Sequence, residues 1–334
     1  WRPNHPLSKV AERSWALHAL AQAYQMTGNP GRAGPLYQRA VSLRQESSFT
    51  IDLSSGYRDL AYAQRLVGGL YTSEQAARQA VLLDRQDDNR LLEAISLQVL
   101  GLALAARGEA EGSAQALDRS LDLADRTNAN RAYNHHAMRA LWFGDYQAAL
   151  QWAEKGQHFS RERKLEAAQI LAGRLKGQAA LGLGDFPGAE RALEQALAEA
   201  RSVILVEEEI AASIALAELR WHQGKTEPAL DLLDELWEPL RHAPYRLFHT
   251  DACNLLATIL RAQGSNVAAR EVALRAYELA WCDGAPYCYH AGLQAARAHL
   301  DALEAAYPTL EPFQPAAFPA MPSVDLNPPG PGPQ

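Results

Sequence analysis

Seven glycines recur at an almost constant interval along the chain, and this interval constrains the fold more than any other feature. They are Gly28, Gly68, Gly108, Gly144, Gly184, Gly224 and Gly264, spaced 40 residues apart except for one interval of 36. Each glycine lies between two stretches with apolar residues at helical spacing. Glycine suits the end of a helix because it adopts the left-handed backbone conformation without steric cost. The repeated unit is therefore predicted to be a helix, a tight turn and a second helix.

Small residues keep step with these glycines. Seven residues before each glycine stand Ala21, Ala61, Gly101, Ala137, Gly177, Ala217 and Ala257, and five residues after it stand Ala33, Ser73, Ser113, Ala149, Ala189, Ala229 and Ala269. Small side chains at these positions allow the two helices of a hairpin to approach closely. A single hairpin cannot bury its own apolar face, so stacked neighbours must complete the core.

The sequence therefore predicts an all-α fold, a right-handed superhelix of seven hairpins. Residues 1–13 are expected to form a lead-in and residues 14–304 the repeat array, closed by a capping helix at about residues 289–304. The short interval between Gly108 and Gly144 indicates either a local change of curvature or a binding insert.

The last 30 residues, 305–334, are rich in proline and cannot continue the array, because proline lacks the N–H and forces extended backbone. Phe313, Phe318 and Met321 are expected to pack back onto the last helix. The final "NPPGPGPQ" is expected to be disordered.

The repeat pattern resembles the tetratricopeptide repeat. The first helix has a leucine and a small residue followed by an aromatic such as Tyr24, and the second has small, bulky and small residues, as in Ala33, Tyr37 and Ala40. The resemblance covers about residues 14–304. The period of 40 residues exceeds the roughly 34 of the commonest form, and longer helices account for the difference.

Both ends carry a second resemblance. "HPLSKVAERSWALHALAQAY" and "AYELAWCDGAPYCYHAGLQAARAHLDAL", with the proline-rich close, are similar to C-terminal repeat regions of bacterial STAND signal-transduction NTPases, relatives of NACHT and NB-ARC switches. The resemblance implies a sensor array that controls an N-terminal effector through a nucleotide-binding module. The chain contains no such module and starts at Trp1, as expected for a domain of a longer protein.

Composition narrows the possible partners. A formal net charge of −7 argues against nucleic-acid binding, and no apolar run approaches the roughly 18 residues that crossing a bilayer needs. Three cysteines, an odd number, argue against a disulfide framework and indicate a reducing, cytoplasmic setting.

Motifs that suggest chemistry have simpler explanations. Gly224, Lys225 and Thr226 match the end of a phosphate loop, but Leu219 stands where the loop needs its first glycine. The acids Glu207–Glu209 are interpreted as a solvated helix start, where negative charge suits the dipole. Because no acid/base pair or cofactor motif is found, the sequence predicts neither an enzyme nor a cofactor.

Cys282, Cys288 and His290 lie close together in sequence and suggest a metal site. Cys288 and His290 are two residues apart, so they would diverge on a helix, and zinc would also need a fourth ligand. We therefore predict no metal, and interpret this stretch as a seal over the last hydrophobic face.

The concave surface is the predicted site. In stacked hairpins the first helix of each unit lines the inner groove. That register selects Trp15, His18, Gln22, Arg58, Tyr62, Arg65, Gln98, Arg131, Asn134, Met138, Arg174, Gln178, Glu218, Trp221, Asp251, Asn254 and Arg261. Arginine side chains bind carboxylates or phosphates through paired hydrogen bonds, and Asn or Gln amides form hydrogen bonds with extended peptide backbone. Aromatic residues often contribute much of the binding energy at protein interfaces.

These features favour a non-catalytic module that binds a protein or peptide in its groove. By resemblance, it would be the sensor domain of a STAND-type NTPase, with N-terminal NTPase and effector modules as further partners. Two alternatives stay open. The chain could be a free-standing adaptor, or it could sense a small molecule, which would need a narrower, closed pocket.

Overall fold

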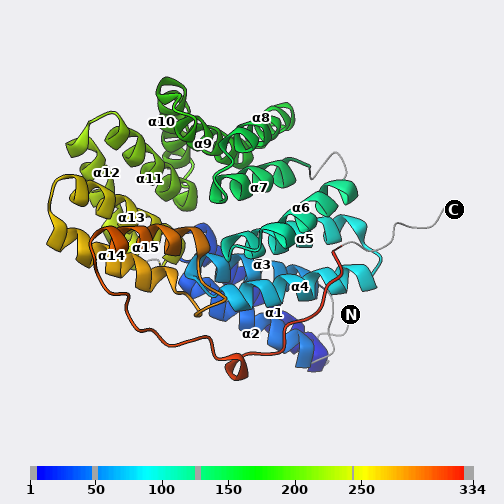
Figure 1. The fold of residues 1–334 in the computed structure, drawn as a ribbon. Coiled ribbons are helices and arrows are strands. Elements are labelled where there is room, and N and C mark those ends of the chain that lie inside the picture. The colour runs from blue at the N-terminus through cyan, green and yellow to red at the C-terminus, as the bar shows by residue number, and fades with distance from the viewer. Residues whose placement is uncertain (1–5, 47–51, 125–128, 243, 327–334) are drawn as a thin grey trace.

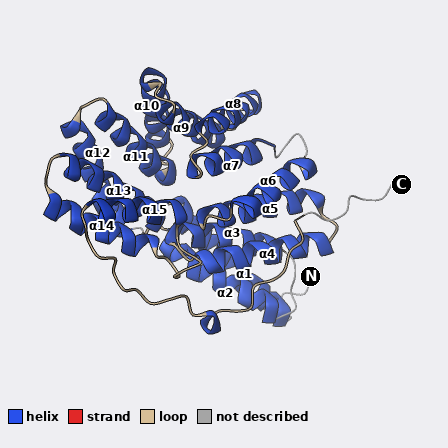
Figure 2. Ribbon diagram, viewed as in Figure 1, coloured by secondary structure: helices blue, strands red, loops and turns tan. Residues whose placement is uncertain are grey.

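The structure, a computed structural model, describes residues 6–46, 52–124, 129–242 and 244–326 (Figure 1). Within these ranges the chain forms fifteen α-helices, one short 3-10 helix and no strand (Figure 2). The α-helices are α1 (Pro6–Met26), α2 (Pro30–Glu46), α3 (Leu53–Val67), α4 (Leu70–Gln86), α5 (Arg90–Ala106), α6 (Ala110–Leu123), α7 (Ala129–Trp142), α8 (Tyr146–Arg163), α9 (Glu166–Gly182), α10 (Phe186–Ser202), α11 (Val206–His222), α12 (Thr226–His242), α13 (Arg246–Ala262), α14 (Asn266–Ala280) and α15 (His290–Ala302). The short 3-10 helix is Pro315–Ala317.

The predicted repeat fold is confirmed. Successive helices pair as seven hairpins, from α1 with α2 to α13 with α14, and α15 caps the last one. All seven turn glycines have left-handed backbone, with φ between 74° and 90°. At Gly184 the next N–H, from Asp185, donates to the Ala180 carbonyl at 2.9 Å, which satisfies the end of α9. The connector residues 125–128, within the 36-residue interval, lie outside the described ranges.

The small residues of the two helices face each other, as the spacing predicts. The Ser113 hydroxyl donates to the Gly101 carbonyl at 2.7 Å, across the hairpin of α5 and α6. A Cβ added at Gly101 would lie 2.7 Å from the Leu117 side chain, and one at Gly177 would lie 2.6 Å from Leu193. Larger residues at these positions would therefore force the helices apart.

The superhelix closes on itself. A Cβ added at Gly28 would lie 2.7 Å from Val206, one at Gly68 would lie 2.5 Å from Arg246, and one at Gly108 would lie 2.6 Å from His290. These three partners lie at the first residues of α11, α13 and α15. Repeat one thus contacts repeat six, repeat two contacts repeat seven, and repeat three contacts α15, which follows repeat seven. We call this junction the seam.

A C-terminal strap, residues 305–326, runs outside the helices from α15 to α4 (Figure 1). Its Phe313 and Phe318 rings pack on Tyr71 of α4, with centroids 5.0 and 4.8 Å away. These two rings were expected on the last helix. They lie on α4 because the closed superhelix brings repeat two beside the cap. The final "NPPGPGPQ" falls outside the described residues.

Cys253, Cys282 and Cys288 are all free thiols. None of the helices in the described ranges has both the length and the apolar character that a membrane span requires.

The seam predicts unequal costs for two otherwise matched substitutions. Gly28 and Gly184 both have φ of 80°, but nothing lies within 4 Å of a Cβ at Gly184. Gly184→Ala should therefore cost about 1 kcal/mol, the strain of left-handed backbone. Gly28→Ala adds a clash with the β-branched Val206, so we expect a larger loss in urea unfolding. Equal losses would contradict closure at this point.

Candidate functional site

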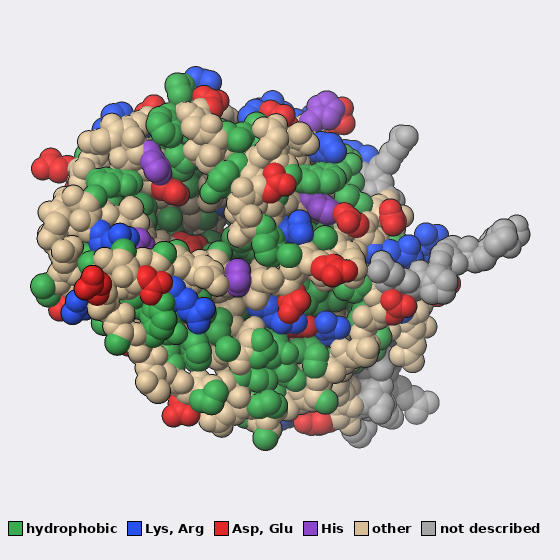
Figure 3. All heavy atoms as spheres, in the orientation of Figure 1, with side chains coloured by type: hydrophobic (Ala, Val, Ile, Leu, Met, Phe, Trp, Pro, Cys, Tyr) green, Lys and Arg blue, Asp and Glu red, His purple; other side chains and the backbone are tan. Residues whose placement is uncertain are grey.

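A cavity of about 420 Å³, partly open to solvent, lies inside the closed superhelix, and we call it the lumen. A space-filling view shows the molecule hollowed near its centre (Figure 3). The wall comes almost entirely from the first helices of the repeats, namely α3, α7, α9, α11 and α13, with Tyr146 and Tyr289 added. The lining residues are Arg65, Leu66, Met138, Leu141, Trp142, Tyr146, Arg174, Leu175, Gln178, Leu181, Gly182, Glu207, Ala211, Ile214, Glu218, His222, Leu247, Phe248, Asp251 and Tyr289.

Six of the sequence-predicted groove residues meet in this lumen: Arg65, Met138, Arg174, Gln178, Glu218 and Asp251. Three of them, Met138, Gln178 and Glu218, stand six residues before the turn glycines of consecutive repeats. They therefore lie in a row along the wall, in which the side chain is apolar at Met138, an amide at Gln178 and an acid at Glu218.

A second group of predicted residues links neighbouring repeats. These residues stand ten positions before the turn glycines, and their side chains contact the next repeat. Their partners there are Asp59 for His18 (3.1 Å), Ser96 for Arg58 (3.2 Å), the Ala168 carbonyl for Asn134 (3.3 Å), Glu208 for Arg174 (2.7 Å) and the Gly292 carbonyl for Asn254 (3.0 Å). Arg58 also pairs with Asp84 of its own repeat at 3.1 Å. Gln98 occupies the same position and is fully buried. Of this group, Arg174 alone also lines the lumen.

The remaining predicted residues lie apart from the lumen. Trp15, Gln22 and Arg131 are exposed. The Tyr62 hydroxyl donates to Glu207 at the seam, and Trp221 packs against a hydrophobic cluster of α11 to α13.

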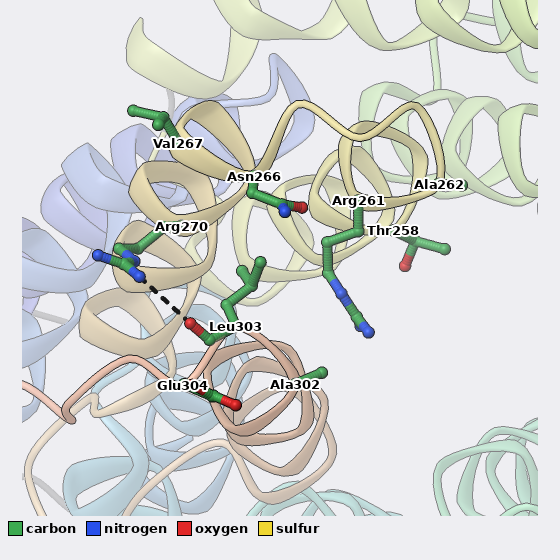
Figure 4. Close-up of a pocket in the computed structure, with 9 residues that line it drawn as sticks. All are labelled: Thr258, Arg261, Ala262, Asn266, Val267, Arg270, Ala302, Leu303 and Glu304. Carbon is green, nitrogen blue, oxygen red and sulfur yellow. Dashed lines mark hydrogen bonds between the residues drawn. The ribbon is translucent and has the colours of Figure 1, made fainter.

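Arg261 belongs to a different hollow, an open pocket of about 670 Å³ at the C-terminal edge of the array (Figure 4). Its wall comes from the end of α13, the start of α14 and the end of α15, where Arg270 donates to the Leu303 carbonyl at 3.2 Å. The Arg261 guanidinium lies 3.0 Å from His299 Nδ1. Val267 at this pocket is 77% exposed. This pocket therefore lies at an edge of the array and is separate from the lumen inside the superhelix.

Several lumen residues were missed by the sequence analysis, among them Trp142, Glu207, His222, Phe248 and Tyr289. Helical spacing could have found the first four. Trp142 lies four residues after Met138, Phe248 three before Asp251, and Glu207 and His222 share a face with Glu218. Tyr289 lies beyond the last repeat, and only the closed fold places it there.

Two arginines of the lumen are already paired with acids. Arg174 Nε lies 2.7 Å from Glu208, and Arg65 lies 3.9 Å from Glu207, which also accepts the bond from Tyr62. The interpretation of Glu207 and Glu208 as a solvated helix start was wrong. The start of α11 meets α3 and α9 because the superhelix closes and neighbouring repeats stack, so both carboxylates serve as internal partners.

Glu218 and Asp251 form an acidic pair with no matching cation. No Lys or Arg of the described residues forms a salt bridge with either carboxylate, although Tyr289 Oη donates to Asp251 at 3.2 Å. Burial and the nearby Glu218 raise the pKa of Asp251 to about 7. The Glu218 side chain is open to the lumen, yet burial among the surrounding helices raises its pKa, against the opposing effect of His222. Glu218 and Asp251 are thus two neighbouring acids without a Lys or Arg partner, and their surroundings favour the protonated forms.

The cysteine-rich stretch forms the expected seal. Cys288 and Tyr289 are buried in the hydrophobic cluster of α13 to α15, with Trp281, Cys282 and Tyr287 packed against it. Among the residues that the structure describes, no group of three His, Cys, Asp or Glu side chains is placed to hold a metal ion.

Comparison with known proteins identifies the fold. No family model matches the sequence, and a search of curated proteins gives no significant match. A Rap protein complexed with Competence and Sporulation Factor aligns with a TM-score of 0.66 and 15% identity, over 80% of this chain and 74% of that chain. The apo form of RapI aligns with a TM-score of 0.58 and 13% identity, over 86% of this chain and 99% of that chain. A tetratricopeptide repeat protein from Parabacteroides merdae has a TM-score of 0.48, with 13% identity over 86% of this chain and 99% of that chain. At these identities the Rap structures show that this chain shares their helical-repeat fold.

The raised pKa of Asp251 predicts a pH-dependent stability. The unfolded carboxyl titrates near pH ~4, whereas the folded one titrates at about 7. Between these values the folded chain keeps a proton that the unfolded chain has lost, so stability falls as pH rises through the window. Asp251→Asn removes this loss and should gain about 3 to 4 kcal/mol over wild type at pH 8. The gain should shrink by pH 5 in urea unfolding, and an equal gain at both pH values would contradict the shift.

Proposed function

We propose that the chain is a non-catalytic binding module that takes a peptide segment with a cationic group into its lumen. The observation that carries this proposal is the pair Glu218 and Asp251, which has no Lys or Arg partner, inside this cavity. An ammonium or guanidinium group between the two carboxylates would form charge-assisted hydrogen bonds to both. It would also offset the burial and the repulsion by Glu218 that together raise the pKa of Asp251.

The rest of the wall suits the remainder of such a ligand. Trp142, Phe248 and Tyr289 present aromatic surface near the acids, which favours both apolar groups and cations. Gln178 can bond to a peptide backbone. The volume of about 420 Å³ falls in the range of roughly 300 to 1,000 Å³ for small-ligand sites. It fits the end of a peptide or a few residues, but not a folded domain.

The Rap comparison supports a bound ligand. The Rap protein aligned here was solved in complex with Competence and Sporulation Factor. A protein of the same fold therefore holds another molecule.

We further propose that this module acts as a sensor, as the resemblance to STAND-type NTPases implies. A ligand in the lumen would touch α3, α7, α9, α11 and α13 at once. It would therefore favour the closed arrangement over any open one, and such differential affinity is what a switch requires. A reading frame upstream of Trp1 without a phosphate-loop module would contradict this part of the proposal.

The volume of about 420 Å³ also favours a second candidate, a small cationic molecule instead of a peptide. A free-standing adaptor is a further alternative, but it would bind its partners on open surface. The three free thiols are compatible with our placement of the module in the cytoplasm.

A binding selection tests the proposal. Wild-type protein would be incubated with a pooled library of synthetic tri- to hexapeptides and a panel of small amines, and retained molecules identified by mass spectrometry. We expect retained peptides to carry a free amino terminus, Lys or Arg. Glu218→Gln and Asp251→Asn should each weaken binding about tenfold or more, because each removes one charged acceptor.

The matched control is Glu271→Gln, at an exposed position on α14, which should bind like wild type. Retention of amines alone would favour the small-molecule candidate. Equal retention by wild type and both lumen variants would contradict the proposed site.

A further inference from the structure

The C-terminal strap joins two parts of the closed superhelix that are far apart in sequence. Its first half contacts repeat seven, where the Tyr307 ring stacks on Tyr277 at 5.6 Å. There Trp281 Nε1 also donates to the Glu311 carbonyl at 2.7 Å. Its second half contacts repeat two, where the Tyr71 hydroxyl donates to the Pro319 carbonyl at 2.6 Å. The strap therefore spans the seam from outside.

Aromatic rings anchor the strap at the crossing point. Phe313 lies against Tyr287, with centroids 4.7 Å apart, and against Phe318 at 5.3 Å. Both phenylalanines also contact Tyr71, at the start of α4. Tyr71 comes from repeat two and Tyr287 from the segment between α14 and α15, so this ring cluster links the two sides of the seam.

The far end of the strap is inserted into the core of the N-terminal repeats. Arg78 of α4 donates to the Pro322 carbonyl at 3.4 Å. Val324 is buried in the hydrophobic cluster of α1 to α6, and Leu326 packs against the same cluster. Several backbone carbonyls of the strap thus accept bonds from side chains of the array.

The strap is less tightly held than the helices beneath it. Apart from one short 3-10 turn it is extended, and most of its residues are exposed, with Val324 the single buried one in residues 305–326. Its prolines keep it from joining a helix. Segments with few buried contacts and exposed backbone open at lower free energy than helical cores, so the strap can detach while the hairpins stay folded.

We propose that residues 305–326 are a detachable clasp that holds the superhelix closed, and that their release separates repeat seven from repeat two and opens the lumen. The direct ties across the seam include apolar contacts, because Leu66, Leu70 and Ala106 belong to the hydrophobic clusters of α11 to α15. Polar ties cross the seam as well. They include Asp283 accepting from the Tyr71 N–H at 2.8 Å and the group of Tyr62, Arg65 and Glu207. The clasp adds the ring cluster and the buried end to these ties.

The consequence for ligand entry rests on the proposed function, but the clasp itself can be tested without a ligand. Cys282 reports on the seam because a Cβ at Gly68 would lie 3.2 Å from its Sγ. The thiol is half-buried, and burial raises the pKa of Cys282 to about 12. Opening of the seam would expose it to an alkylating reagent.

The experiment compares wild type with a Phe313→Ala/Phe318→Ala double variant of the full chain. Each would be treated with N-ethylmaleimide, and modification of Cys282 followed by peptide mass spectrometry. We expect modification to become faster on the order of tenfold, because several aromatic contacts are lost together. The helical circular dichroism should stay unchanged.

Gln314→Ala is the matched control, since this exposed strap residue lies between the two anchors. It should label like wild type. An unchanged rate in the double variant would overturn the clasp. Faster labelling with loss of helical signal would overturn it too, because the strap would then be a part of the folded core. Either outcome leaves the lumen proposal to its own binding test.

Discussion

Closure of the superhelix is the constraint on which the rest of the structure depends. The turns of repeats one, two and three abut the first residues of α11, α13 and α15, and glycine at each turn leaves room for this approach. In an open array the inner helices would line a broad groove. In the closed one they surround a lumen of about 420 Å³, and Glu207 comes within reach of Tyr62 and Arg65. The raised pKa values of Asp251 and Glu218 follow from the same arrangement, because burial by the surrounding repeats is their largest cause.

The repeat could be predicted from sequence, because the residues that define it act locally. A turn glycine such as Gly184 is required by the left-handed backbone at its own position. A small residue such as Gly101 is required by the close approach of the other helix in the same hairpin. The helices that line the inside could be predicted for the same reason. Even so, the inner face of these helices carries some residues that line the lumen and others that bind the next repeat, and sequence alone does not distinguish the two. Asn134 and Asn254 look like ligand contacts, but they bind backbone of the next repeat.

Closure could not be predicted, because it depends on small rotations added over five repeats. A period of 40 residues gives helix lengths but not the pitch that brings Val206 to Gly28. The errors have this common origin. Glu207 was interpreted as solvated, the strap rings were expected on the last helix, and Tyr289 was not considered as a wall residue. Each of these residues meets a partner that only the closed superhelix supplies.

The lumen and the strap suggest how such an array could serve as a switch. A ligand in the lumen would contact both sides of the seam and stabilise closure from inside, whereas the strap would stabilise it from outside. A ligand and a strap that both favour the closed state are thermodynamically coupled. Attachment of the strap would therefore raise the population of the closed state that binds the ligand, and ligand binding would favour attachment of the strap. The acidic pair would select the ligand, and the strap would set how readily the lumen opens.

Photo-crosslinking tests closure most directly. A photo-reactive amino acid in place of Val206, at the first residue of α11, should crosslink to the α1–α2 turn around Gly28. Glu166 opens α9 one repeat earlier, and the same amino acid there should give no link to α1 or α2. Crosslinks from position 206 to residues 27–31, identified by peptide mapping, are the predicted result. Links confined to α9 through α13 would show an open superhelix and contradict the account.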